Sequence, residues 1–190
     1  MADFLATLPL GKLLPPGRHG AETFDSIALC RLPVDACTLV AGRDRAAVIA
    51  RAKSLGADLC DGPRRSAGEN VAFVGVGPGR WLALSKLSGL AERLEAAFAP
   101  EASVFAQGGG VVVLEASSAA TRAVLAKLVP LDLERFALGE AATTTAAHIN
   151  LTLWRHHEDH WRFVVGRSYL AAFLRALAGA AAEYGLDWTG

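Results

Sequence analysis

The feature that most constrains this chain is the segment 73–85, which reads FVGVGPGRWLALS. Two apolar runs lie on either side of Gly77-Pro78-Gly79, and Trp81 opens the second run. Apolar runs joined by a short Gly- and Pro-containing connection are typical of a β-hairpin. The segment therefore predicts two paired strands, with the Trp81 ring in the core.

A second hairpin followed by an apolar helix is predicted near the end of the chain. Strands at 144–155 and 161–165 are joined by a turn of two histidines and two carboxylates at 156–159. The helix begins near Ser168 and carries apolar side chains at helical spacing, which predicts that one face is buried. The residues expected on that face are Tyr169, Leu170, Phe173, Leu174 and Leu177.

Strands and single helices alternate along the rest of the chain. Asp44 is a suitable N-cap for a helix that ends at Gly56, and Ser117 or Ser118 can cap another. The remaining expected elements are strands at 26–32, 36–41, 103–106 and 111–115 and a helix at 90–98. This order predicts an α+β fold, with antiparallel or mixed sheets and the helices packed on one side.

The domain organisation follows from length and from one proline-rich segment. A chain of 190 residues with 52% hydrophobic content is long enough for one well-formed core. The sequence PPGRHG at 15–20 does not suit a helix or a central strand, so residues 1–24 are expected to form an extended N-terminal arm. Residues 25–190 are expected to form a single domain with two lobes, 25–100 and 101–190.

Charge and composition exclude several classes of partner. Nineteen basic and nineteen acidic residues cancel, so no field attracts nucleic acid or an anionic membrane surface. No apolar run reaches the roughly 18 residues that a membrane span needs, and no basic segment precedes the apolar start, so a cytoplasmic location is expected. The three cysteines contain no CxxC pair, which predicts free thiols rather than a disulfide framework or a thiolate metal site.

Glycine-rich segments give no nucleotide-binding pattern. Residues 75–79 and the triple glycine at 108–110 both lead into strands, whereas a phosphate-binding loop leads into a helix N-terminus. Pro78 also removes one of the amides that such a loop requires. The sequence has no Gly-x-Ser-x-Gly elbow, so nucleophilic catalysis is not indicated. We expect no catalytic or cofactor-binding residue on this chain.

Histidines make up the densest set of potential metal ligands. His156, His157 and His160 lie at the tip of the second hairpin and allow two interpretations, a solvated turn or a zinc site in an enzyme. Neighbouring residues on an extended chain point to opposite faces, which favours the turn. We therefore expect no metal here. His148, inside the predicted strand 144–155, is expected to be a core or interface residue.

Aromatic residues are the main candidates for structural or interface roles. Trp81, Trp154 and Trp161 are candidates because aromatic side chains contribute much of the binding energy at interface centres. Arg167 and Tyr169, at the junction of the last strand and the last helix, complete the set. A mean hydropathy of +0.30 also favours apolar surface that a partner covers.

Several sequence motifs, taken in order, resemble the gamma subunit of heterotetrameric sarcosine oxidase. The similarity extends over residues 71–184, and the proline-containing leader and the first strands fit more loosely. That subunit is similar to a shortened form of the folate-binding aminomethyltransferase fold of the glycine-cleavage T-protein. The matching motifs are GPGRW at 77–81 followed by LAL, VPLDL at 129–133, FALG at 136–139, Thr144 and GRSYLAAFL at 166–174.

The resemblance implies a noncatalytic subunit that supports the assembly of a complex. Its partners would be the alpha, beta and delta subunits, which would carry FAD, FMN, NAD, zinc and tetrahydrofolate. The complex would oxidatively demethylate sarcosine to glycine, hydrogen peroxide and methylene-tetrahydrofolate. Many relatives have an aspartate and a serine just before the strand at 111–115. Ala106 and Gly108 stand there, so a carboxylate that could orient a folate amine is missing.

An alternative is a free-standing protein that binds folate or a one-carbon adduct in a cleft between its lobes, as larger relatives of this fold do. Arg167 would then be a candidate clamp for a ligand carboxylate. Titration with tetrahydrofolate separates this alternative from the subunit interpretation.

Overall fold

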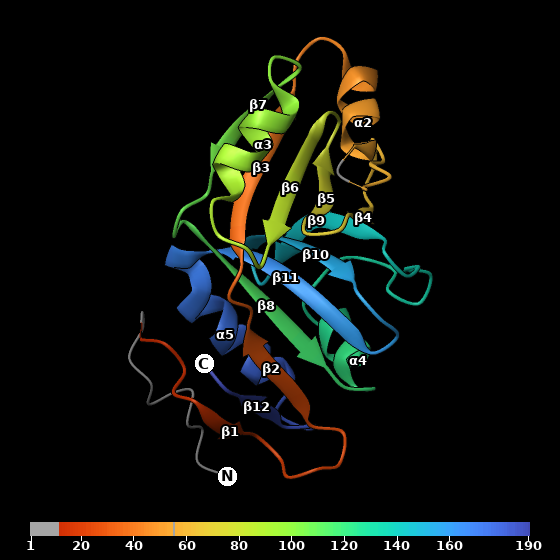
Figure 1. The fold of residues 1–190 in the computed structure, drawn as a ribbon. Coiled ribbons are helices and arrows are strands. Elements are labelled where there is room, and N and C mark those ends of the chain that lie inside the picture. Colours follow the sequence, from red (N-terminus) through yellow and green to blue (C-terminus); the bar gives the residue numbers. More distant parts are fainter. Residues whose placement is uncertain (1–11, 55) are drawn as a thin grey trace. The chain divides into compact units, whose positions relative to one another are not determined.

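The computed structural model of the chain describes residues 12–54 and 56–190. These residues form two compact units, which are described one at a time (Figure 1). Unit 1 contains the described residues as far as Leu32 together with Val112–Leu138 and Thr144–Gly190, and unit 2 contains Pro33–Val111 and Gly139–Thr143. The predicted lobes divide the chain at a single point, whereas the chain passes from one of these units to the other four times.

Unit 2 is built on an antiparallel five-stranded sheet with two helices. In spatial order the strands are β4 (Arg65–Ala67), β5 (Ala72–Gly77), β6 (Arg80–Ser85), β3 (Asp35–Ala41) and β7 (Ala102–Ala106). The helices are α2 (Arg45–Lys53) and α3 (Leu90–Phe98). Alternate strand residues such as Leu39, Phe73 and Trp81 form one core with apolar residues of both helices, including Val48 and Leu94. Both helices thus cover the same face of the sheet, as predicted.

Two local features of unit 2 agree with their predictions. The predicted hairpin is β5–β6, and Gly79 at its turn has φ +63°, a left-handed conformation that favours glycine. Asp44 caps α2, because its side chain accepts a 3.0 Å hydrogen bond from the Ala47 N–H. This bond satisfies one of the amides that a helix N-terminus leaves without an internal partner.

A mixed seven-stranded sheet forms the centre of unit 1. Its order is β1 (Gly17–His19), β12 (Leu186–Trp188), β2 (Ile27–Arg31), β8 (Val111–Ser117), β11 (His160–Gly166), β10 (Ile149–Arg155) and β9 (Ala141–Ala146). β12 runs parallel to β2 and antiparallel to β1. The other elements are α4 (Thr121–Ala126), a 3₁₀ turn η1 (Arg167–Tyr169) and α5 (Leu170–Ala180). Phe173 of α5 packs on Phe163 of β11 with 5.8 Å between ring centroids.

The predicted strand 144–155 is wrong, because the chain turns in its middle. β9 ends at Ala146 and β10 begins at Ile149, and the two residues between them, Ala147 and His148, have φ +47° and +67°. Two successive positive φ values are those of the tight turn that joins hairpin strands with the natural twist. His148 is therefore an exposed turn residue and not a core residue inside a strand. Neither position carries the Gly or Asn that would have revealed the turn.

The last helix also differs from its prediction at its first residue. Leu170, Phe173, Leu174 and Leu177 are buried as expected. Tyr169 is not on the buried face, since it lies in η1 and its side chain is 58% exposed. Residues 167–169 form a 3₁₀ turn with three residues per turn, so the spacing of the buried face of α5 does not continue back to Tyr169.

The described part of the predicted N-terminal arm is extended and packed against the sheet. Gly17–His19 form edge strand β1, and Leu14 is only 1% exposed. The Leu14 carbonyl accepts a 3.0 Å hydrogen bond from the indole N–H of Trp188. Residues 1–11 of the predicted arm lie outside the described residues. Within the described residues, no helix has the length and apolar character to cross a membrane.

Candidate functional site

The GPGRW segment holds a neighbouring loop against the unit 2 hairpin. Trp81 is completely buried, and its indole N–H donates a 2.7 Å hydrogen bond to the Cys60 carbonyl. Asp61 accepts a 2.7 Å hydrogen bond from the Gly79 N–H and a 2.8 Å bond from the Arg45 guanidinium. These two bonds, the one from Gly79 first, lower the pKa of Asp61. The motif therefore fixes the loop to the hairpin by a set of specific bonds.

Close backbone packing explains why position 75 of the same segment is a glycine. A Cβ at Gly75 would lie 1.8 Å from the Gly62 carbonyl oxygen, which no real contact allows. The Gly75 N–H also donates a 3.0 Å hydrogen bond to the Arg64 carbonyl. Gly75, Gly79 and Trp81 of segment 73–85 are thus accounted for by packing and by bonds to the neighbouring loop.

The structure places the five candidate interface residues in two different environments. Trp154 and Trp161 are each 1% exposed and, like Trp81, they belong to the core. The Trp161 ring packs on Phe136 with 5.5 Å between centroids. Arg167 and Tyr169, by contrast, are exposed on η1. Of the five candidates, these two are accessible to a partner.

A charged cluster lies across neighbouring strands of the unit 1 sheet. Arg162 Nε of β11 donates a 2.6 Å hydrogen bond to Glu115 Oε2 of β8, and His160 Nδ1 lies 3.8 Å from the other carboxylate oxygen. Burial opposes the ionisation of Glu115, but the bond and charge of Arg162 outweigh it and lower the pKa of Glu115. The cluster is therefore an ion pair with a permanently charged carboxylate near neutral pH.

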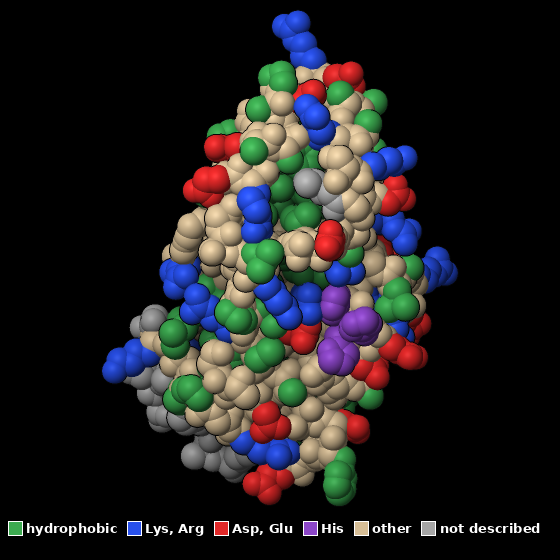
Figure 2. Space-filling view, viewed as in Figure 1, with side chains coloured by type: hydrophobic (Ala, Val, Ile, Leu, Met, Phe, Trp, Pro, Cys, Tyr) green, Lys and Arg blue, Asp and Glu red, His purple; other side chains and the backbone are tan. Residues whose placement is uncertain are grey.

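The histidines of the β10–β11 turn lie close together at the surface. The ring centroids of His156 and His157 are 4.4 Å apart, and those of His157 and His160 are 5.8 Å apart. Figure 2 shows histidine side chains gathered in one group on this face of the molecule. Even so, no set of three or more His, Cys, Asp or Glu side chains among residues 12–54 and 56–190 is placed to hold a metal ion.

The thiols of two of the three cysteines are held in the unreactive form. Burial is the largest cause that raises the pKa of Cys30, followed by the charge of Glu115, which faces it across β2 and β8. Burial likewise raises the pKa of Cys37, with Asp35 adding to the effect. Cys60 is exposed. A raised pKa keeps a thiol protonated at neutral pH, and the protonated form is a poor nucleophile.

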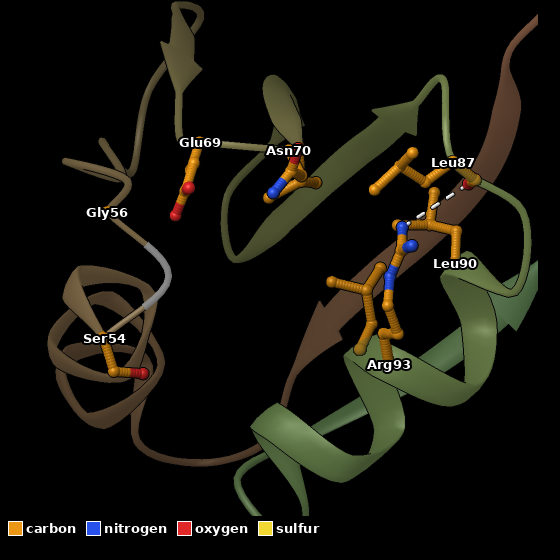
Figure 3. A pocket seen from close by; sticks show the side chains of 9 residues that line it. Ser54, Gly56, Glu69, Asn70, Leu87, Leu90 and Arg93 are labelled. Atoms are coloured by element: carbon orange, nitrogen blue, oxygen red, sulfur yellow. Dashed lines mark hydrogen bonds between the residues drawn. The ribbon is translucent and has the colours of Figure 1, made fainter.

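One pocket lies within unit 2, between the end of α2, the β4–β5 connection and α3 (Figure 3). Val71, Leu90 and Leu94 supply apolar lining, and Glu69 and Arg93 line it as charged residues. The Arg93 guanidinium donates hydrogen bonds to the Ser88 and Leu87 carbonyls and to Ser85 Oγ, so it holds the β6–α3 connection. A volume of about 270 Å³ is below the roughly 300–1,000 Å³ of most ligand sites. The pocket suits an apolar side chain better than a folate-sized molecule.

Large apolar side chains at the surface are the remaining feature. Phe24 stands out with a relative exposure of 111%, and sequence analysis did not single it out. The sequence signal that could have identified Phe24 is an aromatic residue that lies between the acidic residues Glu22 and Asp25 and belongs to no apolar pattern. Within residues 12–54 and 56–190, the other large exposed apolar residues are Leu13, Leu87, Phe105, Leu138 and Tyr169.

A comparison with known protein families shows which family the chain belongs to. The model of the family described as "Sarcosine oxidase, gamma subunit family" matches residues 41–183. The chain belongs to this family. The matched range includes the hairpin of unit 2 and the β10–β11 hairpin with α5, so both motif-rich regions are inside it.

Curated relatives of this gamma-subunit family member carry the same description. The sarcosine oxidase subunit gamma of Arthrobacter sp is 36% identical over 119 residues, which are 60% of this chain and 59% of the relative. The corresponding subunit of Corynebacterium sp. (strain P-1) is 34% identical over 120 residues, 61% of this chain and 59% of the relative. The chain thus spans less than two thirds of the length of these relatives.

Solved structures confirm the fold class of the gamma-family chain. A chain of the heterotetrameric sarcosine oxidase from Corynebacterium sp. U-96, solved with pyrrole 2-carboxylate, has a TM-score of 0.76 at 24% identity and covers 87% of this chain and 88% of its own length. The glycine cleavage system aminomethyltransferase T from Bartonella henselae has a TM-score of 0.64 at 15% identity, covering 87% of this chain and 48% of its own length. The expected likeness to the T-protein fold is confirmed.

Proposed function

We propose that this chain is the noncatalytic gamma subunit of a heterotetrameric complex that oxidatively demethylates sarcosine. The proposal rests on the family match over residues 41–183. Its partners are alpha, beta and delta subunits, which bind FAD, FMN, NAD, zinc and tetrahydrofolate. The complex is cytoplasmic, and its products are glycine, hydrogen peroxide and methylene-tetrahydrofolate.

The chemistry of the titratable groups supports a role without catalysis. A general acid must hold a proton near neutral pH, yet Arg162 keeps Glu115 ionised. A thiol nucleophile needs a depressed pKa, yet the pKa values of Cys30 and Cys37 are raised. These pKa directions suit neither a general acid at Glu115 nor a thiolate nucleophile at Cys30 or Cys37.

Assembly is the role that this surface suits. Several large apolar side chains remain exposed in the isolated chain, and each loses water contact only when a partner covers it. Arg167 and Tyr169, which lie in the same short turn η1, are the candidate interface residues in this exposed class. An aromatic and a guanidinium are the residue types enriched at interface centres.

Reconstitution tests the proposal directly. The chain is co-expressed with the alpha, beta and delta subunits of a sarcosine oxidase, and the complex is separated by gel filtration. We expect this chain to elute with the other three in equal amounts and the complex to oxidise sarcosine. The chain alone is expected to show no turnover. Consistent elution as a lone monomer, or sarcosine turnover by the isolated chain, contradicts the proposal.

The likeness to aminomethyltransferase T supports a second candidate, a free-standing protein that binds tetrahydrofolate or a one-carbon adduct. Arg167 is exposed and could bind the ligand's carboxylate. Calorimetric titration with tetrahydrofolate should then release heat in the wild type and much less in Arg167→Ala, with Arg122→Ala as a control at another exposed arginine. Absence of heat in the wild type removes this candidate.

A further inference from the structure

Phe24 is the most exposed large apolar side chain among the described residues. Its relative exposure is 111%, so none of residues 12–54 and 56–190 shields the ring. It lies in the turn between β1 and β2, flanked by Thr23 and Asp25. Exposing a complete phenyl ring to water gains nothing for the isolated fold, since burial of such a side chain is favourable.

The turn that carries Phe24 is fixed on both sides of the ring. The Thr23 carbonyl accepts a 3.0 Å hydrogen bond from Arg18, and the Thr23 hydroxyl donates to the Tyr184 carbonyl. On the other side, Ser118 Oγ donates a 2.8 Å hydrogen bond to the Asp25 carbonyl. The ring is therefore presented by a backbone that is already ordered. Binding through an ordered residue costs less conformational entropy than binding through a mobile one.

Acidic side chains accompany the ring. Glu22 and Asp25 are both exposed, and neither forms an ion pair with any residue that the structure describes. The nearby cation, Arg18, faces Asp187 at 3.8 Å and is bonded to Thr23. The surface around Phe24 thus combines one large apolar group with two unneutralised negative charges.

We propose that Phe24 is the anchor of a docking surface, formed with Glu22 and Asp25, that inserts into an apolar pocket with a basic rim on another subunit. This inference rests on the proposed function. A buried aromatic anchor supplies affinity, and opposite charges at the rim supply orientation and a faster encounter. A second copy of this chain is the wrong occupant, because a symmetric contact would place the acidic groups of both copies together.

The test compares two phenylalanines. The other three subunits are purified as a complex, and the chain is titrated onto them as wild type, Phe24→Ala and Phe105→Ala. Phe105 is the matched control, since its side chain is 55% exposed on β7. We expect Phe24→Ala to raise the Kd at least about tenfold and Phe105→Ala to leave it within about twofold. The Kd of Phe24→Leu should lie between the Kd of the wild type and that of Phe24→Ala. Melting temperatures should match the wild type, because the Phe24 ring is fully exposed beside the residues that the structure describes.

Charge reversal supplies a second readout. Glu22→Lys with Asp25→Lys should slow association with the three-subunit complex, and the difference from the wild type should shrink as salt is added. Faster association of the double variant would contradict the proposal that the partner's pocket has a basic rim.

The alanine variants test the role of Phe24 as the anchor. If Phe24→Ala binds with wild-type affinity, or if Phe24→Ala and Phe105→Ala lose affinity equally, Phe24 is not the anchor, while the proposed function stands. Failure of the wild type to bind overturns the proposed function itself. Self-association of the wild type that Phe24→Ala abolishes assigns the surface to a second copy and overturns the inference.

Discussion

The indole N–H of Trp81 lies 2.7 Å from the carbonyl oxygen of Cys60, so a completely buried ring of the hairpin is bonded to a loop 21 residues earlier in the chain. The next loop residue, Asp61, is bonded to Gly79, at the turn of the same hairpin. The aromatic and glycine residues of GPGRW thus act together as an attachment point for the loop.

Loss of the indole hydrogen bond should be measurable. Trp81→Phe removes the donor and part of the ring, and we expect the free energy of unfolding to fall by about 2–4 kcal/mol. Trp154→Phe is the matched control, because Trp154 is equally buried but its N–H has no hydrogen-bond partner among the described residues. Urea denaturation followed by circular dichroism should show the smaller loss for Trp154→Phe. Equal losses would mean that the bond to Cys60 contributes little.

Gly75 should be the least replaceable glycine of the hairpin. Gly75→Ala places a methyl group 1.8 Å from the Gly62 carbonyl oxygen, so the loop must move, at a cost of about 3 kcal/mol or more. Gly77→Ala is the control, since its new methyl group meets only the Arg80 side chain at 4.0 Å. Thermal unfolding of both variants checks this. A Gly75→Ala protein as stable as Gly77→Ala would show that the loop yields easily.

A substitution in the β9–β10 turn should stabilise the protein. Ala147 has φ +47°, a conformation that is costly for alanine and that asparagine tolerates better. Ala147→Asn should therefore raise the free energy of unfolding by about 0.5–1 kcal/mol. Ala146→Asn, which places the same amide at a position only 1% exposed, should destabilise the protein instead. Chemical denaturation of the pair decides whether the gain is specific to the turn.

The contribution of the Glu115–Arg162 pair to the free energy of unfolding should decrease as the pH is lowered. Because the pKa of Glu115 is lowered in the folded state, its contribution is present above the ordinary glutamate pKa of about 4.3 and is lost as the pH falls through the folded value. In Arg162→Met the half-buried carboxylate loses its partner. The variant should be destabilised at pH 7, and the difference from the wild type should shrink below about pH 4.3.

Lys127→Met is the control for that experiment. Lys127 pairs with Glu183, whose side chain is 60% exposed, so the solvent screens the interaction. We expect a much smaller change in stability at pH 7 than for Arg162→Met. A difference between Arg162→Met and the wild type that stays constant from pH 7 to pH 3 would show that Glu115 does not titrate as described.

The three thiols should react at different rates. Cys60 is exposed, whereas Cys37 is buried and the pKa values of both Cys37 and Cys30 are raised. A chromogenic disulfide reagent at pH 8 should label one thiol per chain rapidly, and Cys60→Ser should abolish this fast phase. The other two thiols should react fully only in denaturant. A fast phase that persists in Cys60→Ser would contradict the assignment.

Local signals in the sequence were sufficient for most of unit 2. Gly79 in the hairpin turn and Asp44 at the helix cap are residue types whose conformational preferences are strong enough to determine local structure. The turn at Ala147-His148 has no such residue, so the threonines before it and the apolar residues after it merged into one apparent strand. Its positive φ values result from the pairing of β9 with β10, which sequence periodicity does not describe.

The candidate site was harder to predict than the fold. Trp154 and Trp161 are core residues because both strands that carry them lie inside the sheet, and sequence alone does not give strand order. Phe24 was missed because periodicity identifies buried faces, whereas a single exposed ring in a turn belongs to no pattern. Its position became informative only when the bonds to Thr23 and Asp25 could be seen.

The placement of β12 between β1 and β2 has a consequence for biosynthesis. A ribosome makes residues 17–31 early and Leu186–Trp188 more than 150 codons later, yet the first strand has its ladder partner only in that late segment. This edge of the sheet therefore cannot close before residues 186–188 have left the ribosome. Until then, β1 and the β12-facing edge of β2 have no ladder partner and are open to chaperones and other chains, so translation speed and chaperone supply should influence the yield of folded protein.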